Sequence, residues 1–314
     1  MLSRFQNSAQ RNWRQIYDSF VPKMPKLDAA EQTKLSWAKL IGSYTAVPDV
    51  FKDFFASLQK EGPDSPYTVL TPSYEGFLHP TTEKLICDFV HEIHVLERIG
   101  NSYEDHCYPV EKISYIGSQT ILLDAYIKIC GSTKDGKAGC STVRFNAVTD
   151  TLFEPLLARM RQGEGDAAHS ELEKFDRWAQ VNYKFMMCAR CSLLGSERVI
   201  QAHLQPAIRV PRFSLLGRTF YRTISSTHAI ILTDREIISI QEDSWSGSIW
   251  EYLPLHNIVT LSLSVRNNGL LALCIQLPGN IQLENLFEDS AKRDLDEFLE
   301  IYQRLTIQKE KGRL

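Results

Sequence analysis

The spacing of hydrophobic positions predicts helices at the start of the chain. Within residues 1–62, apolar side chains recur at roughly helical intervals, and prolines separate the runs. One helix is predicted near the first residues, a second over 28–44, and a third over 48–61 with a proline at its first turn. We therefore expect an N-terminal helical segment over 1–62.

The rest of the chain alternates short β-type runs with single helices. From Tyr67 the apolar runs become short, and they end at an amphipathic helix predicted over 151–161. A polar linker and a helix over about 170–187 follow, after which the β-type pattern returns. Apolar residues at i, i+3, i+4 and i+7 predict a last helix over 289–306. Both β-rich regions thus end in a helix that can pack on a sheet.

The two β-rich regions also match each other in sequence order. LICDFVHEIHVLE at 85–97 aligns without a gap with AIILTDREIISIQ at 229–241, and each predicts two strands around a tight polar turn. Residues 108–113 then align with 253–258, and the agreement in order continues to the two helices. We interpret this pattern as an internal repeat of one domain.

The strings that carry the repeat resemble a known family. Residues 230–240, with the pattern xxLTxxxIxxI, residues 253–258 (LPLHNI) and the helix over 289–306 are similar to the pleckstrin-homology-like fold in its bacterial and GRAM-like variants. The likeness is strongest in the second β-rich region, weaker in the first and absent from the helical start. It implies small antiparallel β-barrels, each closed by a C-terminal helix. Another kind of small antiparallel barrel is the alternative.

The predicted fold class is α+β, with an N-terminal helical segment followed by two small antiparallel β-barrel domains. Each hairpin leaves one apolar face, a small sheet closes on itself to bury it, and a helix covers the open end. The predicted divisions are a helical segment at 1–62, a first pleckstrin-homology-like domain at 63–163, a linker and helix at 164–190, and a second such domain at 191–314.

Composition limits the classes of function. The 314 residues are 43% hydrophobic and 23% charged, which is typical of a folded protein with more than one small core. A net charge of -3 argues against nucleic acid as a partner, because such binding needs a concentrated excess of Lys and Arg. No apolar run is long enough to cross a bilayer, and the first residues lack the apolar core of a secretory signal. The seven scattered cysteines predict a reducing compartment, hence the cytoplasm.

The stretch GSTKDGKAG at 131–139 comes within one residue of the phosphate-binding pattern G-x-x-x-x-G-K-[ST]. Ala138 stands where that pattern needs a hydroxyl for magnesium, and the residues that follow predict a strand instead of the required helix. The repeat aligns the stretch with a short turn near Gly279. We expect a hairpin tip that carries Lys134 and Lys137, and no nucleotide site.

Cysteine and histidine spacing gives no closed metal site. Cys188 and Cys191 form a lone C-x-x-C, for which helix packing is favoured over metal or redox use. His91 and His94 are three apart in a predicted strand, so they face opposite sides and cannot share a metal without a bend. Together with His106 they are expected at a surface or an edge. No catalytic order of Ser, His and Asp and no dinucleotide glycine pattern appears, so we predict no catalytic, cofactor-binding or metal-binding residues.

The segment PAIRVPRFSLLGRTFYR at 206–222 is the most informative local feature. No acidic residue occurs between Arg198 and Leu232, whereas arginines surround apolar residues throughout. Such a loop can press apolar tips into a membrane interface while its arginines pair with phosphates. The alternative is that the segment covers the N-terminal helices or the other β domain, with its arginines paired to acids. The predicted membrane-binding or partner-binding residues are Arg209, Arg212, Phe213, Leu215, Leu216, Arg218 and Arg222.

We expect a non-catalytic adaptor or assembly module in the cytoplasm or at the membrane periphery. It would bind protein partners or an anionic phospholipid surface through its pleckstrin-homology-like domains, and it would use no cofactor. The family resemblance places the basic segment where phosphoinositide-binding members carry their basic loop, although the full basic motif of that loop is not reproduced. The alternative is a small-molecule-binding or hydrolytic protein with a site between the two barrels. A third hypothesis is a homo-oligomer that assembles through exposed strand edges.

Overall fold

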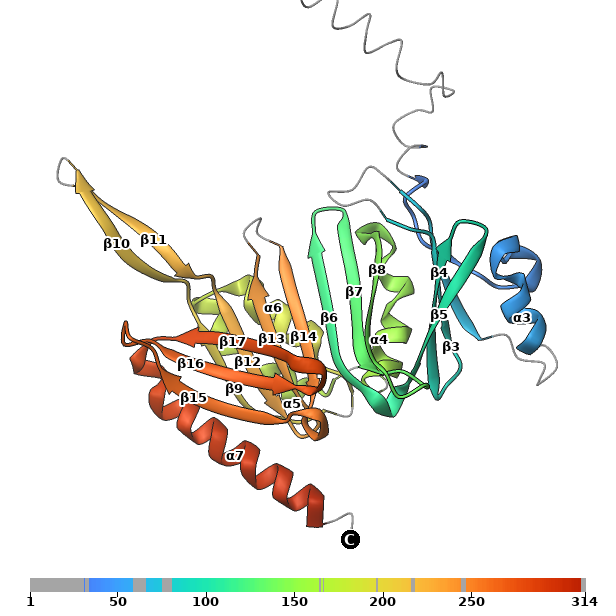
Figure 1. Ribbon diagram of the computed structural model, residues 1–314. Coiled ribbons are helices and arrows are strands. Elements are labelled where there is room, and N and C mark those ends of the chain that lie inside the picture. Colours follow the sequence, from blue (N-terminus) through green and yellow to red (C-terminus); the bar gives the residue numbers. More distant parts are fainter. Residues whose placement is uncertain are drawn as a thin grey trace, which may run out of the picture.

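Short apolar runs separated by tight polar turns build most of the described chain as antiparallel strands, shown in Figure 1. The computed structural model describes residues 31, 34–58, 66–74, 81–163, 165, 167–195, 197–215, 218–243 and 247–311. The strands within these residues form four antiparallel sheets, and helices lie against the sheet faces.

The first half of the chain supplies two of the layers. A five-stranded sheet has the order β1 (Lys39–Leu40), β2 (Tyr67–Thr71), β3 (Lys84–Asp88), β4 (Glu92–Ile99) and β5 (Ser102–Pro109). The 3-10 turn η3 (Val110–Lys112) then redirects the chain into a second layer, made of β6 (Ile113–Ile121), β7 (Asp124–Ser132) and β8 (Ala138–Asn146). The helical turns η4 (Ala147–Leu152) and α4 (Glu154–Met160) end this half.

The second half begins with helices and continues with a further set of strands. The helices are α5 (His169–Glu173), η5 (Asp176–Gln180) and α6 (Tyr183–Ser192). Strands β9 (Val199–Gln205), β10 (Ile208–Leu215), β11 (Arg218–Ser225), β12 (His228–Thr233), β13 (Glu236–Glu242) and β14 (Ser248–Pro254) follow. After η6 (Leu255–Asn257) come β15 (Thr260–Val265), β16 (Leu271–Leu277), η7 (Pro278–Asn280), β17 (Ile281–Phe287), η8 (Asp289–Ala291) and α7 (Lys292–Lys311).

The expected pair of closed barrels is wrong, because the sheets are open. Strand β6 of the first half pairs with β14 of the second, with Glu251 opposite Gly117, so one sheet of seven strands crosses the boundary between the halves. Its order is β8-β7-β6-β14-β13-β12-β9, while β15-β16-β17 and β10-β11 form separate sheets. Strands β6 and β14 are the edges through which each half could have closed into a barrel. Pairing these two strands with each other satisfies their backbone hydrogen-bonding groups equally well.

The expected N-terminal helical segment is also wrong for the described residues. Lys39 and Leu40, inside the helix predicted over 28–44, instead form a strand that pairs with Leu70 and Val69 at the sheet edge. Pairing with a sheet edge outweighs the local helical spacing here. The third predicted helix, by contrast, is confirmed where the structure describes it, as η2 (Asp49–Phe51) and α3 (Lys52–Leu58). The first predicted helix lies outside the described residues.

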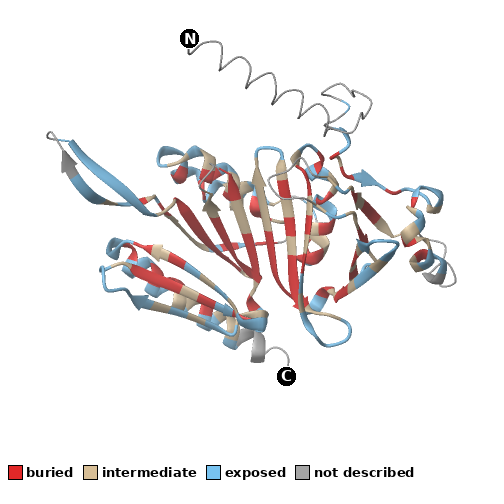
Figure 2. Ribbon diagram, turned by 45° about the horizontal axis from the view of Figure 1, so that its top comes forward, coloured by how far each residue is buried: buried red, intermediate tan, exposed pale blue. Residues whose placement is uncertain are grey.

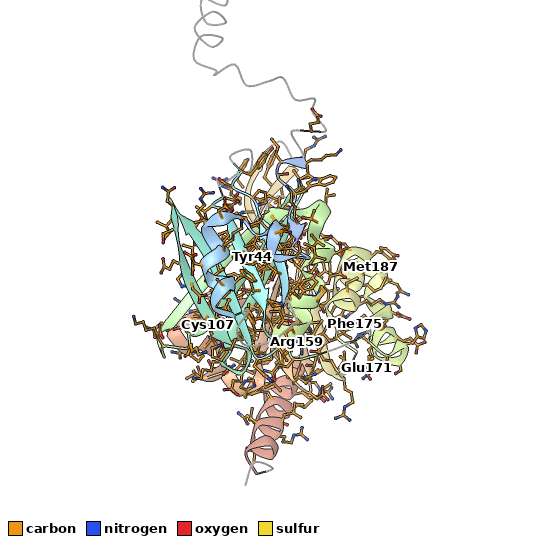
Figure 3. All side chains as sticks on the ribbon, turned by 90° about the vertical axis from the view of Figure 1, so that its right-hand side faces the viewer. Tyr44, Cys107, Arg159, Glu171, Phe175 and Met187 are labelled. Atoms are coloured by element: carbon orange, nitrogen blue, oxygen red, sulfur yellow. A yellow bond between two sulfur atoms is a disulfide. The ribbon has the colours of Figure 1, made fainter. Side chains whose placement is uncertain are left out.

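The helix predicted over 170–187 is broken into the three pieces α5, η5 and α6. The side chain of Asn182 accepts a hydrogen bond from the backbone N–H of Phe185, which makes Asn182 the N-cap of α6. The cap starts a new helix where the apolar pattern alone predicts continuity. Figure 3 shows that Phe175 and Met187 of this helical layer lie on the opposite side of the molecule from Cys107 on β5.

The core is continuous across the boundary between the halves. In β12 all six residues are buried, since Ile231 faces the cluster that includes α6 whereas Ile230 faces the cluster beneath α7. A strand that is covered on both faces has apolar residues at consecutive positions, which explains the sequence AIIL at 229–232. Figure 2 shows this buried band along the central strands of the seven-stranded sheet.

Candidate functional site

The segment predicted to bind a membrane or a partner forms a two-stranded arm. Strands β10 and β11 pair only with each other and project away from the seven-stranded sheet, as Figure 1 shows. We call this hairpin, residues 208–225, the arginine arm. Most of its described residues are exposed, and Figure 2 shows it projecting from the body of the molecule. Sequence reasoning predicted the residues but described them as a loop.

Two phenylalanines stack on one face of the arginine arm. Phe213 lies opposite Phe220, and their ring centroids are 4.7 Å apart with an interplanar angle of 19°. They remain 49% and 46% exposed. Because side chains alternate along a strand, Arg218 and Arg222 share the face of Phe220, whereas Tyr221, 62% exposed, lies on the other face. An apolar pair is thus flanked by two cations on one face.

The charge of the arginine arm is unbalanced. Arg209, Arg212, Arg218 and Arg222 are all exposed, and Arg212 sits at an irregularity in the strand register. Within the described part of the chain none of these four makes an ion pair, whereas Arg198 near the base of the segment pairs with Asp234 at 3.1 Å. The alternative in which acids neutralise the segment therefore has no support in the described contacts.

For two of the predicted arm residues the structure describes no side chain. Leu215 ends β10, and Leu216 lies outside the described residues. The structure therefore brings five of the seven predicted side chains onto one hairpin.

A buried arginine links the two halves of the chain. Arg161, directly after α4, donates from Nε to Glu236 at 2.8 Å and from Nη2 to Glu197 at 3.2 Å. Its guanidinium also lies 4.0 Å from the ring centroid of Tyr252, a cation–π contact. Burial and the neighbouring Glu236 raise the pKa of Glu197 to about 8. Sequence reasoning missed this cluster because its members are far apart along the chain and no motif joins them.

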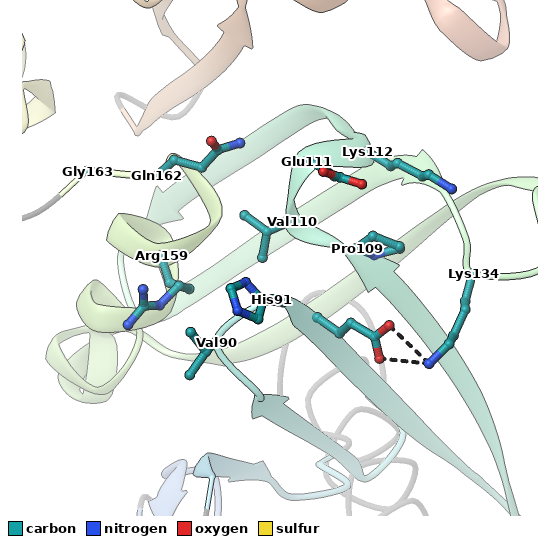
Figure 4. Close-up of a pocket in the computed structure, with 11 residues that line it drawn as sticks. Val90, His91, Pro109, Val110, Glu111, Lys112, Lys134, Arg159, Gln162 and Gly163 are labelled. Atoms are coloured by element: carbon teal, nitrogen blue, oxygen red, sulfur yellow. Dashed lines mark hydrogen bonds and ion pairs between the residues drawn. The ribbon is translucent and has the colours of Figure 1, made fainter.

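Two cavities lie beside this cluster. The first, of about 690 Å³, is lined by β4, η3, the GSTKDGKAG turn and the end of α4, and is shown in Figure 4. Glu92 and Lys134 form an ion pair of 3.0 Å within it. At its rim Val90 has a φ of 70°, a strained conformation for a β-branched residue. The second cavity, of about 610 Å³, is lined by residues of both halves, including Lys112, Arg161 and Arg235.

The stretch GSTKDGKAG forms the predicted hairpin tip. It joins β7 to β8, and the strand that follows it excludes the strand-to-helix geometry of a phosphate-binding loop. The backbone N–H of Lys134 donates to the carbonyl of Cys107 at 2.9 Å, so the tip folds back onto β5. Lys134 thereby reaches a strand of the other sheet.

One group of residues in the described chain has the composition of a metal site. On the hairpin of β4 and β5, ligand atoms of Glu92, His94 and Cys107 all lie within 4.8 Å of one another. His91, by contrast, is exposed in the turn before β4 and lines the 690 Å³ cavity. Burial raises the pKa of the Cys107 thiol to about 12. Sequence reasoning considered His94 but missed its neighbours, because Cys107 meets it only through the strand register.

The remaining cysteines divide into a disulfide and separate thiols. Cys130 and Cys140 form a disulfide between the paired strands β7 and β8. Disulfides are characteristic of oxidising compartments, so this bond does not match the reducing compartment expected from the cysteine count. Cys188 and Cys191 lie on α6 and join no group of three metal-ligand residues in the described chain. None of the described helices combines the length and the apolar character needed to cross a membrane.

The chain matches no protein-family model, and no curated protein matches it. The arm, the cavities and the side-chain clusters described above are therefore the features that indicate a function.

Proposed function

We propose that this protein is a non-catalytic adaptor that binds an anionic phospholipid surface through the arginine arm. The observation that carries the proposal is the combination of a projecting acid-free hairpin, four exposed arginines and a half-exposed phenylalanine pair. Arginines pair with lipid phosphates, and each basic residue near an anionic surface contributes about 1 kcal/mol. Four arginines together with apolar insertion thus supply reversible membrane association.

In this proposal the charge of the arm faces a membrane and not the body of the protein. An anionic lipid surface attracts basic segments, so the proposal makes the protein a peripheral membrane protein. The phenylalanine pair would enter the interface, and Arg218 and Arg222 on the same face would remain at the level of the headgroups. A protein partner with an acidic groove is the other outcome of the test.

Vesicle flotation tests the proposal. The full chain should float with vesicles that contain phosphatidylserine and not with vesicles of phosphatidylcholine alone. Changing Arg209, Arg212 and Arg218 to Glu should abolish flotation, because each reversal replaces attraction with repulsion.

A matched control reverses three exposed cations elsewhere. Lys292, Arg293 and Arg304 on α7 are exposed, and changing them to Glu alters the net charge by the same amount. This control should retain most of its binding. Wild-type protein that fails to float, or an arm variant that floats as well as the wild type, would contradict membrane binding by the arm.

A second candidate function is binding of a small anionic molecule in the cavity between the halves. The observation that favours it is the presence of Lys112 and Arg235 in the lining of that cavity, beside Glu111 and Glu236. Inorganic phosphate and pyrophosphate are suitable probes in a thermal shift experiment. A rise in melting temperature that is lost in Lys112→Met, but kept in Lys292→Met on α7, would support it. Absence of any shift would rule out these anions as ligands.

A further inference from the structure

We infer that Glu92, His94 and Cys107 form a three-ligand site for a divalent ion of the zinc class, on the hairpin of β4 and β5. Imidazole nitrogen, thiolate sulfur and carboxylate oxygen are the three donor types that zinc prefers in proteins. The register makes His94 and Cys107 direct cross-strand partners, and Glu92 lies two residues from His94 on the same face. All three side chains therefore project from the same face of the hairpin of β4 and β5.

Two of the three distances between the donor atoms fit one tetrahedral ion, and the third is within 4.8 Å. With bonds of about 2.3 Å to sulfur and about 2.0 Å to nitrogen or oxygen, the edges of a tetrahedral site measure about 3.3–3.6 Å. Oε2 of Glu92 lies 3.5 Å from Sγ of Cys107 and 3.6 Å from Nε2 of His94. The carboxylate is thus already at the separation that a shared ion requires.

A fourth residue orients the histidine for this role. Both carboxylate oxygens of Asp105 lie 3.0 Å from Nδ1 of His94. A metal-bound histidine usually donates its other ring N–H to a carboxylate, which fixes the ring and directs the free nitrogen to the ion. Here that arrangement leaves Nε2 facing Glu92. Asp105 is accordingly a positioning residue of the site and not a ligand.

The surroundings hold the histidine ring and leave room for a fourth ligand. The ring centroids of Phe54, on α3, and of Phe89 each lie 5.1 Å from the ring centroid of His94, so both phenylalanines pack against the histidine. Glu92 also lines the 690 Å³ cavity of Figure 4, where Lys134 pairs with its carboxylate. Water from this cavity can supply the fourth position, as in zinc sites with three protein ligands. Nζ of Lys134 lies 3.0 Å from Oε1 and 3.1 Å from Oε2 of Glu92, so an ion at Oε2 would displace the lysine from that oxygen and leave it paired with Oε1.

Titration of the full chain with Co²⁺, without thiol reductants, tests the site. Cobalt replaces zinc in such sites, and a cobalt–thiolate bond gives a near-ultraviolet charge-transfer band. We expect one Co²⁺ per chain, with the band removed by one equivalent of Zn²⁺. Cys107→Ser should lose the band. Glu92→Gln should weaken binding at least tenfold. Asp105→Asn should weaken it about 10–100-fold while keeping the band, as expected for a positioning residue.

Two controls decide between this site and others. The double variant Cys188→Ser with Cys191→Ser removes the C-x-x-C on α6 and should leave the band unchanged. Circular dichroism confirms folding of each variant, and Glu92→Gln changes a partly exposed group, so it provides a test even where Cys107→Ser does not fold. Wild-type protein without a band would overturn the inference. So would a band that survives in both Cys107→Ser and Glu92→Gln, or one lost with the C-x-x-C.

Discussion

Arginines in two regions of this molecule differ in burial and in pairing with acidic residues. Arg161 is buried between the halves, where Glu197, Glu236 and the ring of Tyr252 surround its guanidinium. The arginines of the arginine arm are exposed, and none of them pairs with an acid among the described contacts. Removing a charge from water is expensive unless partners replace the lost hydration, so the buried arginine must have acids nearby. The arm arginines have no such requirement.

The difference separates the structural role of Arg161 from the binding role proposed for the arm. At Arg161 both acids come from the second half of the chain while the arginine follows α4 of the first, so the cluster fixes how the halves meet. In the arm the cations keep their hydration and stay available to an external anion. The same residue type therefore stabilises the fold at one place and presents a surface at the other.

The largest expected effect follows from breaking the buried cluster. Arg161→Met leaves Glu197 and Glu236 buried together without a cation, which should lower the free energy of unfolding by about 3–5 kcal/mol. Urea denaturation measures this change. The matched variant Arg222→Met on the arm should change it by no more than about 0.5 kcal/mol, because that side chain is exposed. Equal effects of the two variants would remove the distinction between the regions.

Local pattern predicted the hairpins but not how they assemble. The sequence segments around Asp234 and Phe89 each predicted two strands and a turn, and the structure contains both hairpins. Apolar runs on both sides of polar turn residues are local signals, so they can be recognised in the sequence. The pairing of Glu251 with Gly117 joins strands that are distant along the chain, and either a closed barrel or a shared sheet would bury the same apolar residues. Composition could not decide between them.

A second prediction uses the pH dependence of the buried cluster. The raised pKa of Glu197, caused mainly by burial, means that the folded state holds a proton which the unfolded state releases at lower pH. Its contribution to stability is therefore present below the ordinary glutamate pKa and is lost as the pH rises toward about 8. Glu197→Gln should match the wild type near pH 5 and be relatively more stable at pH 8.5. A difference independent of pH would show that Glu197 is ionised throughout.

The residues proposed to bind the membrane were easier to find from the sequence than the side-chain clusters. An acid-free stretch with several arginines is visible by inspection, so Arg209, Arg212 and Arg218 could be named. Their arrangement could not, since the stacking of Phe213 on Phe220 depends on the register shift at the intervening bulge. The cluster of Glu92, His94 and Cys107 required the register of another hairpin in the same way.

The third prediction tests the arm by neutralising charge. Changing Arg218 and Arg222 to Gln should weaken binding to phosphatidylserine vesicles by about 2 kcal/mol, roughly 30-fold, since each basic residue contributes about 1 kcal/mol. The free energy of unfolding should stay unchanged within about 0.5 kcal/mol. Changing Lys292 and Arg293 of α7 to Gln is the control. If control and arm variants bind equally, the attraction comes from overall charge and not from the arm.

The smallest effect concerns which face of the arm enters the interface. Phe220 and Tyr221 are neighbours on opposite faces, and only Phe220 stacks on Phe213 between two same-face arginines. About half of the Phe220 side chain is exposed, so its insertion should contribute about 1 kcal/mol. Phe220→Ala should thus weaken vesicle binding about fivefold, whereas Tyr221→Ala should change it less, although Tyr221 is the more exposed. The opposite order would place the tyrosine face against the lipid and assign Arg209, across from Thr223 on that face, to the headgroups.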